Sequence, residues 1–236
     1  MALDFSASAG EDFELARKRL GNDGYLVVSD DELGLPGTRL RDHLLRTYFT
    51  PDVLRCYPGD VPADRERARD VVEYAWHDGV PVLAEHPEIA IEGRGGRPER
   101  REYARTPVVH DPLFASWIRA ALGLIPVHRR RPRGTFGVNI FRTFTNVVTQ
   151  PHADGEEFVF VYVVDRQGSG AETTLFRPEA PGTPLHSQRL EPGQLIVFED
   201  ARFLHTASPL ADPPGGRARR DALVCTVDYR ETYGVS

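Results

Sequence analysis

The chain has 236 residues, of which 40% are hydrophobic and 27% are charged, and its 29 basic and 35 acidic side chains give a net charge of −6. This is the composition of an ordinary globular protein, and the acidic balance argues against nucleic acid as the main partner. The apolar runs are too short to cross a membrane, and the first residues lack the pattern of a secretory signal. With only two cysteines, Cys56 and Cys225, we expect a cytoplasmic protein with no membrane partner and no disulfide framework.

The first half of the chain predicts helices and loops. Apolar periodicity predicts helices over residues 11–20, 37–49 and 111–122, and a short strand over 25–28. Between residues 58 and 105 the pattern loosens into charged segments rich in proline and glycine. We expect this region to form long loops that could cover a site.

From residue 135 the sequence changes to short apolar or alternating runs separated by turn residues. They predict seven strands, over residues 135–144, 157–165, 171–177, 186–190, 194–199, 203–208 and 222–229. Seven strands with short links favour a jelly-roll, cupin-like barrel. We therefore expect a single domain, 1–236, that is mainly β with flanking helices. A helical, loop-rich part, 1–134, would pack on a β core, 135–236.

A possible metal site follows the first of these strands. His152 and Asp154 are two residues apart, so both side chains point to the same face if the segment is extended. His205 in a later predicted strand supplies a second imidazole. Two imidazoles and one carboxylate form the facial triad of non-haem iron(II) oxygenases, which leaves positions open for a bidentate 2-oxo acid and dioxygen. Each residue alone is more often structural, and it is their order along the strands that favours a metal centre.

Arg220 opens the last predicted strand and is the candidate partner of the 2-oxo acid. Its guanidinium could form a bidentate pair with the distal carboxylate of 2-oxoglutarate. Arg217 and Arg219 in the same segment are competitors, and an exposed basic run is the alternative for all three. Strand alternation favours Arg220, because Ala222 and Val224 on its side of the strand are small or apolar.

Several segments occur in the order typical of a known family: EYARTPVVHDPLF, GVNIFRTF, PHADGEEFVFVYVVDR, GAET, LIVFEDARFLHTASPL and RRDALVCTVDYRET. In them the chain resembles the bacterial Fe(II)/2-oxoglutarate-dependent hydroxylases of free amino acids, the group that includes L-isoleucine dioxygenase. The resemblance implies a double-stranded β-helix, iron bound by His152, Asp154 and His205, and 2-oxoglutarate held by Arg220. The implied cofactors are Fe(II), 2-oxoglutarate as co-substrate and O2, with ascorbate as the reductant in vitro.

The resemblance also implies an activity. Related halogenases have a small residue in place of the carboxylate ligand, so Asp154 implies hydroxylation of an unactivated C–H bond. The co-product would be succinate, formed with CO2 from 2-oxoglutarate. The substrate would be a small molecule, a free L-amino acid, whose identity and site of hydroxylation the sequence leaves open, as it does the oligomeric state.

Three residues are candidates for contacts to an amino acid substrate. Arg142 could bind the substrate carboxylate, and an outward-facing surface arginine is an equal alternative. Glu172 could meet the ammonium group, although an exposed glutamate beside a turn is the more common case. Phe158 is one of several phenylalanines in neighbouring strands, of which most would be core and one or two could line an aliphatic pocket.

Three alternatives to this function stay open. The same chemistry could act on an amino acid tethered to a carrier protein or within a peptide. A cupin-like metal enzyme of other chemistry would not need Arg220. A non-catalytic sensor or metal-binding module would be favoured by loss of a triad residue, and all three are present.

Overall fold

The computed structural model describes residues 9–57, 60, 62–87, 104–147 and 149–228. Its strands are β1 (Tyr25–Ser29), β2 (Arg65–His77), β3 (Val80–Glu85), β4 (Arg133–Thr143), β5 (Phe158–Gln167), β6 (Ser169–Gly170), β7 (Glu172–Phe176), β8 (Pro184–Arg189), β9 (Gln194–Glu199), β10 (Leu204–Ala207), β11 (Leu210–Ala211) and β12 (Arg219–Asp228). Its helices are α1 (Ala9–Asp23), α2 (Gly37–Thr47) and α3 (Pro112–Gly123), with short 3-10 turns η1 (Val127–Arg129) and η2 (Asp200–Arg202).

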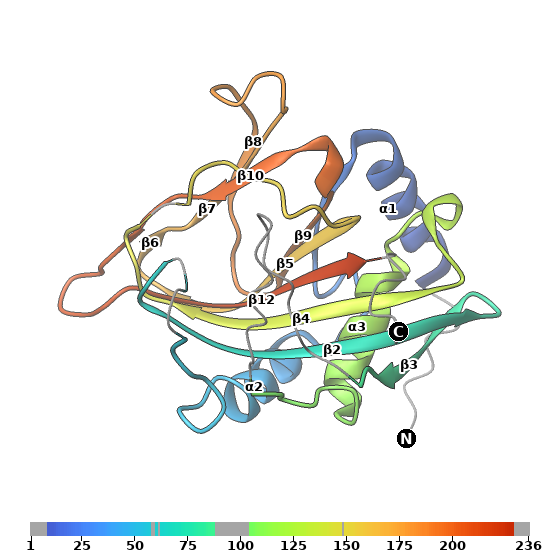
Figure 1. The fold of residues 1–236 in the computed structure, drawn as a ribbon, viewed down its shortest axis with the longest axis horizontal. Helices are drawn as coiled ribbons and strands as arrows, with labels where there is room; N and C mark the ends of the chain where they lie inside the picture. Colours follow the sequence, from blue (N-terminus) through green and yellow to red (C-terminus); the bar gives the residue numbers. More distant parts are fainter. Residues whose placement is uncertain (1–8, 58–59, 61, 88–103, 148, 229–236) are drawn as a thin grey trace.

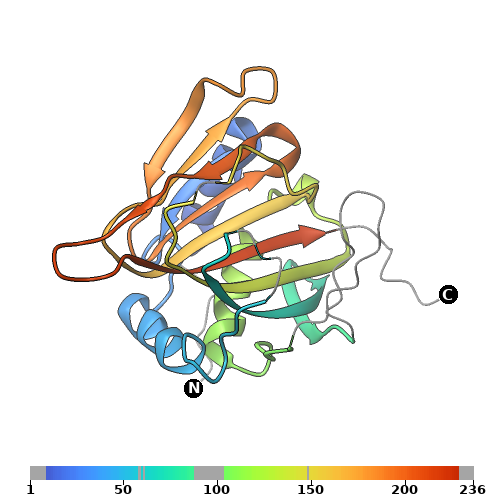
Figure 2. The ribbon, with the colours of Figure 1, turned by 60° about the vertical axis from the view of Figure 1, so that its left-hand side comes forward.

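Two facing sheets form the barrel. The main sheet has seven antiparallel strands in the order β1-β9-β5-β12-β4-β2-β3, and the smaller sheet has the order β10-β7-β8. The smaller sheet lies above the long strands of the main sheet in Figure 1, and the turned view of Figure 2 shows the same two layers. The fold is the expected double-stranded β-helix, mainly β with flanking helices.

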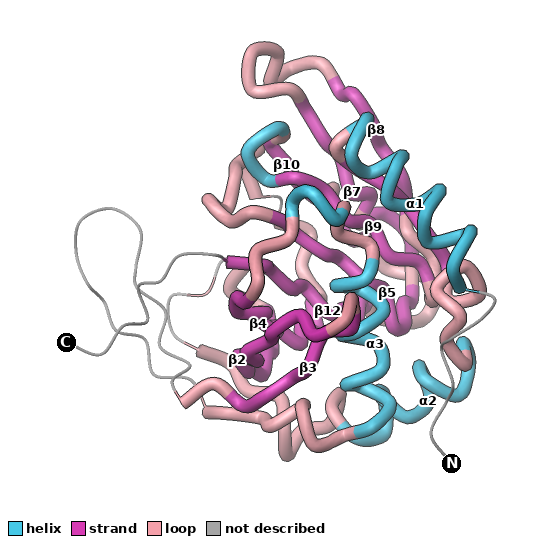
Figure 3. The backbone as a smooth tube through the Cα atoms, turned by 90° about the vertical axis from the view of Figure 1, so that its right-hand side faces the viewer, coloured by secondary structure: helices cyan, strands magenta, loops and turns pink. Residues whose placement is uncertain are grey.

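The helices cover the outer face of the main sheet. Figure 3 shows α1, α2 and α3 gathered on one side of the strands. Apolar residues of the three helices join the sheet in one large cluster, which includes Leu20, Leu44 and Trp117. Among the described residues, no helix is long and apolar enough to span a membrane.

Alternation along the strands divides the main sheet into two faces. The residues that face the helices belong to the large outer cluster and include Phe136, Val138, Ile140, Phe158, Phe160, Leu223, Cys225 and Val227. The opposite parity faces the barrel interior, where a smaller cluster contains Val159, Val161, Val163, Leu175, Leu190, Ile196, Phe198 and Phe203. Which face a side chain occupies therefore decides whether it can reach the interior at all.

All seven strands expected after residue 135 are present, as are the three helices and the strand at residue 25. The expectation of loops throughout residues 58–105 is wrong for part of that region, because β2 and β3 form a long hairpin there and β2 pairs with β4 along eleven residues. The segment 92–102 lies outside the described residues. The main sheet thus takes β1, β2 and β3 from the part of the chain before residue 134.

The start of α3 gives a stability prediction. Asp111 caps the helix by accepting hydrogen bonds from the Leu113 and Phe114 N–H groups, at 2.9 and 3.2 Å, and its other oxygen contacts Tyr48 and His43 from the α2 end. Burial by itself would raise the pKa of Asp111, but hydrogen bonds from His43, Phe114 N–H and Tyr48 outweigh it and lower the pKa.

Asp111→Ala should therefore lower the free energy of unfolding by about 1–2 kcal/mol at neutral pH, the usual effect of losing an N-cap. Because the native pKa is depressed, this difference is complete above the ordinary aspartate pKa of about 3.9 and vanishes as the pH falls through the lower native value. Urea unfolding at a series of pH values measures it, with the exposed Asp52→Ala as control. Equal stability of the Asp111→Ala and Asp52→Ala proteins would contradict the capping role.

Candidate metal and co-substrate site

The two histidines of the predicted triad are cross-strand neighbours. His205 lies on β10, and His152 pairs with it in an isolated antiparallel bridge. The His152 N–H donates to the His205 carbonyl at 3.2 Å, and the His205 N–H donates to the His152 carbonyl at 2.8 Å. Their ring centroids are 4.4 Å apart, and the ring of Phe198 lies 5.0 Å from that of His205. Phe198 belongs to the interior cluster, so the pair sits at the wall of the barrel interior.

Asp154 completes a compact donor set. One of its oxygens is 3.4 Å from His205 Nε2, and the other is 3.8 Å from His152 Nε2. One ligand atom from each residue lies within 4.8 Å of the other two. Adjacent ligands on an octahedral metal with bonds of about 2.1 Å are about 3 Å apart, so small side-chain rotations would bring all three onto one ion. The set fits the facial iron site that the sequence predicts.

The tautomer of His152 is also suited to metal binding. Its Nδ1 lies 2.9 Å from the Gln150 carbonyl oxygen, which can only accept a hydrogen bond. Nδ1 therefore carries the proton and donates, which leaves the lone pair on Nε2 beside Asp154. A backbone carbonyl in this position is a common means of orienting a histidine ligand.

Arg220 is a half-buried cation without a hydrogen-bond partner among the described residues. It is the second residue of β12 and lies on the same parity as Val224, which packs against the interior cluster. Its Nε and Nη2 are buried and form no hydrogen bond among the described residues. Burial, with a smaller contribution from the charge of Arg166, lowers the pKa of Arg220 to about 10. Two buried guanidinium nitrogens without partners among the described residues fit a bound carboxylate, which would supply both hydrogen bonds and charge.

The two competing arginines are already paired with acidic side chains. Arg219 contacts Asp165 and lies 3.4 Å from Asp221 Oδ2. Arg217 is exposed, with its guanidinium over the ring of Phe144 and 3.4 Å from an oxygen of Asp64. Arg220 differs from both in having no acidic side chain as a partner among the described residues.

The structure does not bring Arg142 to this site. Arg142 is the register partner of Asp221, whose side chain is fully buried on the helix-facing side of β12. Its Nε and Nη2 each donate to one oxygen of Asp221, both at 2.8 Å. This pair raises the pKa of Arg142, and the guanidinium lies 5.9 Å from the ring of Phe49 after α2. The expected substrate contact is thus replaced by a structural ion pair on the outer face.

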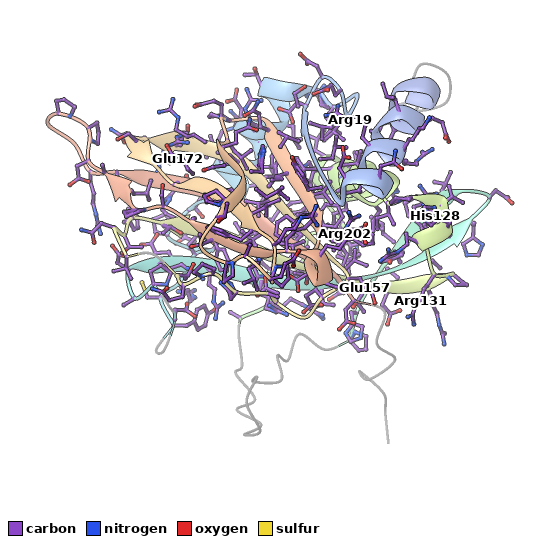
Figure 4. The ribbon with its side chains drawn as sticks, turned by 90° about the horizontal axis from the view of Figure 1, so that it is seen from above. Arg19, His128, Arg131, Glu157, Glu172 and Arg202 are labelled. Carbon is purple, nitrogen blue, oxygen red and sulfur yellow. The ribbon has the colours of Figure 1, made fainter. Side chains whose placement is uncertain are left out.

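Phe158 and Glu172 are also directed away from the interior. Phe158 is fully buried in the outer cluster, with the guanidinium of Arg129 5.8 Å from its ring. Glu172 is exposed because on β7 it is Thr173 and Leu175 that turn inward. Figure 4 shows Glu172 well separated from Glu157 and Arg202, which lie in the segments next to the triad. Like Arg142, these two residues lie on the face of their strand that points away from the barrel interior, where the substrate contact was expected.

Two features of the site were missed from the sequence. Asp200, five positions before His205, is buried against the loop that carries Asp154. Arg69 on β2 lies on the interior parity, in register with Asn139 and, through it, with Val224. The only sequence signal for Asp200 was an acidic residue directly after an apolar strand. Arg69 had none, because β2 itself was not predicted.

Comparison with known proteins identifies the family. A model of the 2OG-Fe dioxygenase family matches residues 95–226. A bsmA homolog from Methylobium petroleophilum PM1 is 23% identical, with a TM-score of 0.74 over 97% of this chain and 96% of that one. The Fe(II)/α-ketoglutarate-dependent dioxygenase TqaL is 15% identical, with a TM-score of 0.68 over 98% of this chain and 94% of that one.

A prolyl-4-hydroxylase from Pseudomonas putida is 14% identical, with a TM-score of 0.54 over 92% of this chain and 99% of that one. At these identities the solved structures establish a shared fold. No curated protein matches the sequence significantly. The family model covers more than half of the chain, and Fe(II), 2-oxoglutarate and O2 are the cofactors of that family. The chain belongs to the 2OG-Fe dioxygenase family.

Proposed function

We propose that this dioxygenase hydroxylates an unactivated C–H bond of a free L-amino acid, with conversion of 2-oxoglutarate to succinate and CO2. His152, Asp154 and His205 would hold Fe(II), and Arg220 would bind the distal carboxylate of 2-oxoglutarate. When bound, Fe(II) and 2-oxoglutarate supply the oxidising chemistry, and the protein decides which C–H bond is exposed to it. The observation that carries the proposal is the compact donor set together with Arg220, whose buried Nε and Nη2 form no hydrogen bond among the described residues.

Asp154 supports hydroxylation as the outcome. A carboxylate in the third ligand position occupies the place that a halide would need. Its backbone is fixed by hydrogen bonding of the Asp154 N–H to Asp200 at 3.0 Å, so the carboxylate is held close to both imidazoles. The role of the chain is therefore to present a complete facial set and to leave the remaining positions to 2-oxoglutarate and O2.

The strands that line the barrel interior differ in polarity, and this supports a substrate with one polar and one aliphatic part. The part of the interior next to His205 is lined by valine, leucine, isoleucine and phenylalanine side chains. The β4 and β2 strands instead present Asn139 and Arg69 on their interior parity. Arg69 Nη1 donates to Asn139 Oδ1 at 2.9 Å, and Asn139 Nδ2 donates to the Val224 carbonyl at 3.2 Å.

Arg69 is therefore our candidate for the substrate carboxylate, in the role that the sequence had suggested for Arg142. It is half-buried, and its contact with Asn139 orients the guanidinium along the interior face. An arginine held in this way loses little further freedom on binding a carboxylate. The likeness to a prolyl-4-hydroxylase gives the peptidyl amino acid as the second candidate substrate.

A pooled assay tests the proposed function. The purified protein with Fe(II), ascorbate, 2-oxoglutarate and the proteinogenic amino acids should yield a product heavier by one oxygen atom, with matching succinate. Asp154→Ala should abolish both, because it removes an iron ligand. Mass spectrometry detects the product, and a second pool of proline-containing peptides covers the alternative. Succinate at background with every substrate would contradict the catalytic function, and turnover of peptides alone would contradict the free amino acid.

A second prediction concerns Arg220. Saturating 2-oxoglutarate should raise the melting temperature of the wild-type protein, because at about 100 times Kd a ligand stabilises the native state by about 2.7 kcal/mol. In Arg220→Met this shift should be lost and the KM for 2-oxoglutarate should rise by about 100-fold, since a charged hydrogen-bonded pair is removed. Arg217→Met is the matched control and should behave as wild type. An unchanged KM in Arg220→Met would exclude the assigned role.

A third prediction compares the two faces of the sheet. Arg69→Met should raise the KM for the hydroxylated amino acid by about 10- to 100-fold, the value of one charged hydrogen bond of about 1.5–3 kcal/mol, and leave the KM for 2-oxoglutarate unchanged. Arg142→Lys keeps a charge opposite Asp221 on the outer face and should leave both constants unchanged. Steady-state kinetics with each variant measure these values. A raised KM for the amino acid in Arg142→Lys, with an unchanged KM in Arg69→Met, would contradict the role of Arg69 and favour Arg142 as the carboxylate contact.

A further inference from the structure

A buried carboxylate joins the two halves of the metal site. Asp200 begins η2, directly after β9, and is only 1% exposed. Its Oδ1 accepts a hydrogen bond from the Asp154 N–H at 3.0 Å, and its Oδ2 accepts from the Gly155 N–H and from the Glu156 N–H at 3.0 Å. Three successive backbone donors of the loop after His152 thus converge on one side chain.

The conformation of this loop depends on that carboxylate. Gly155 has a φ of 76°, a left-handed conformation that glycine adopts without strain. The turn it makes lets neighbouring N–H groups point in one direction, which creates a small anion-binding concavity. The Asp200 carboxylate occupies this concavity. Because Asp154 contributes the first of the three donors, Asp200 fixes the backbone from which the ligand carboxylate projects.

The same carboxylate faces the second imidazole. His205 Nδ1 is buried and has no hydrogen-bond partner in the part of the chain that the structure describes. Asp200 Oδ1 lies 3.7 Å from it. A histidine that binds a metal through Nε2 carries its proton on Nδ1, and that N–H almost always donates to a carboxylate or a carbonyl. A movement of less than about 1 Å would bring these two atoms to hydrogen-bond distance.

The turn that carries Asp200 is held from outside the site. Glu199, next to it, is buried and pairs with Arg129 at 2.7 Å and with Arg202 at 3.2 Å. The Glu199 N–H donates to the Gly24 carbonyl at 2.8 Å, and Arg202 also reaches the Asn22 carbonyl at 3.2 Å. Figure 4 shows Arg202 and Glu157 on the same side of the molecule, on the two segments that this turn brings together. These contacts hold the turn, and therefore the backbone of Asp200, in place.

We infer that Asp200 is a positioning residue for the iron site, which orients Asp154 through its backbone and His205 through Nδ1. This inference rests on the proposed ligand roles of Asp154 and His205. Asp200 would not touch the metal or either substrate. Its effect would be to hold two of three ligands at bonding separation before the metal arrives and to make the His205 imidazole a stronger donor, which raises the affinity for the ion.

Metal titration of the purified apo-protein tests the inference. In Asp200→Asn the side chain keeps its shape, but an amide N–H₂ group replaces one acceptor and the negative charge is lost. We expect Fe(II) affinity, measured without oxygen, to fall by about 10- to 100-fold, the usual cost of losing such a partner. The same loss should appear with Co(II), whose ligand-field absorption should also change in shape because the coordination geometry is altered.

Asp30→Asn is the matched control for the loss of a buried carboxylate. Asp30 is 4% exposed and accepts a hydrogen bond from Tyr162 at 2.7 Å while it contacts Arg41, outside the metal site. Both variants should lower the melting temperature, but Asp30→Asn should keep wild-type metal affinity and Co(II) absorption. Equal metal affinity and identical spectra in the Asp200→Asn and wild-type proteins would overturn the inference, as would an equal loss in Asp30→Asn.

A measurement on the wild-type protein covers the case in which Asp200→Asn does not fold. With Zn(II) as a diamagnetic substitute, NMR should show the His205 Nδ1 proton as a slowly exchanging, downfield signal, because it is buried and donates to a carboxylate. A rapidly exchanging proton, or a deprotonated Nδ1, would overturn the inference. Failure of the proposed ligand roles has a different result: in that case the His152→Ala and Asp154→Ala proteins would bind Fe(II) with the same affinity as the wild-type protein.

Discussion

The alternation of side chains across the main sheet is the constraint on which the rest of the structure depends. On one face of β4, β5 and β12 the side chains pack against the helices, and Phe136, Phe160 and Leu223 are completely buried there. The opposite parity is all that remains to line the barrel interior. Because successive side chains of a strand point to opposite faces of the sheet, a difference of one position decides whether a polar side chain lies in the interior or on the outer face. Arg220 and Asp221 are neighbours in sequence and have entirely different surroundings for this reason.

Much of the fold could be predicted because the strands after residue 135 have a strong and simple pattern. Each is a short apolar or alternating run bounded by turn or polar residues, and a strand was found at each expected place. The hairpin of β2 and β3 was missed because the first half of β2 is highly charged. Arg65, Arg67 and Arg69 alternate there with Glu66, Ala68 and Asp70, which gives a charged sequence without an apolar stripe. Only the register with β4, known from the structure, identifies these residues as part of a sheet.

The metal donor set could be predicted for a local reason, and the substrate contacts could not. His152 and Asp154 share one face whenever their segment is extended, and His205 had to lie on a neighbouring strand for the set to close. The faces of Arg142, Phe158 and Glu172 depend instead on the register between strands far apart in sequence. Arg142 faces outward because it pairs with Asp221, a partner 79 positions away. No periodicity within β4 reports that pairing. Asp200 escaped notice for the same reason, since its three donors come from a distant loop.

The distribution of charge in the interior suggests how the co-substrate and the fold support one another. Arg220 lies near Arg166, which donates to the Leu190 and Gly170 carbonyls and, among the described residues, to no acidic side chain. The like charges of these two guanidinium groups disfavour one another at this end of β12 and β5. If Arg220 binds 2-oxoglutarate as proposed, the dianion would relieve that cost, whereas a neutral or zwitterionic substrate would not. We therefore expect 2-oxoglutarate to bind before the amino acid, because its negative charge offsets the charges of Arg220 and Arg166.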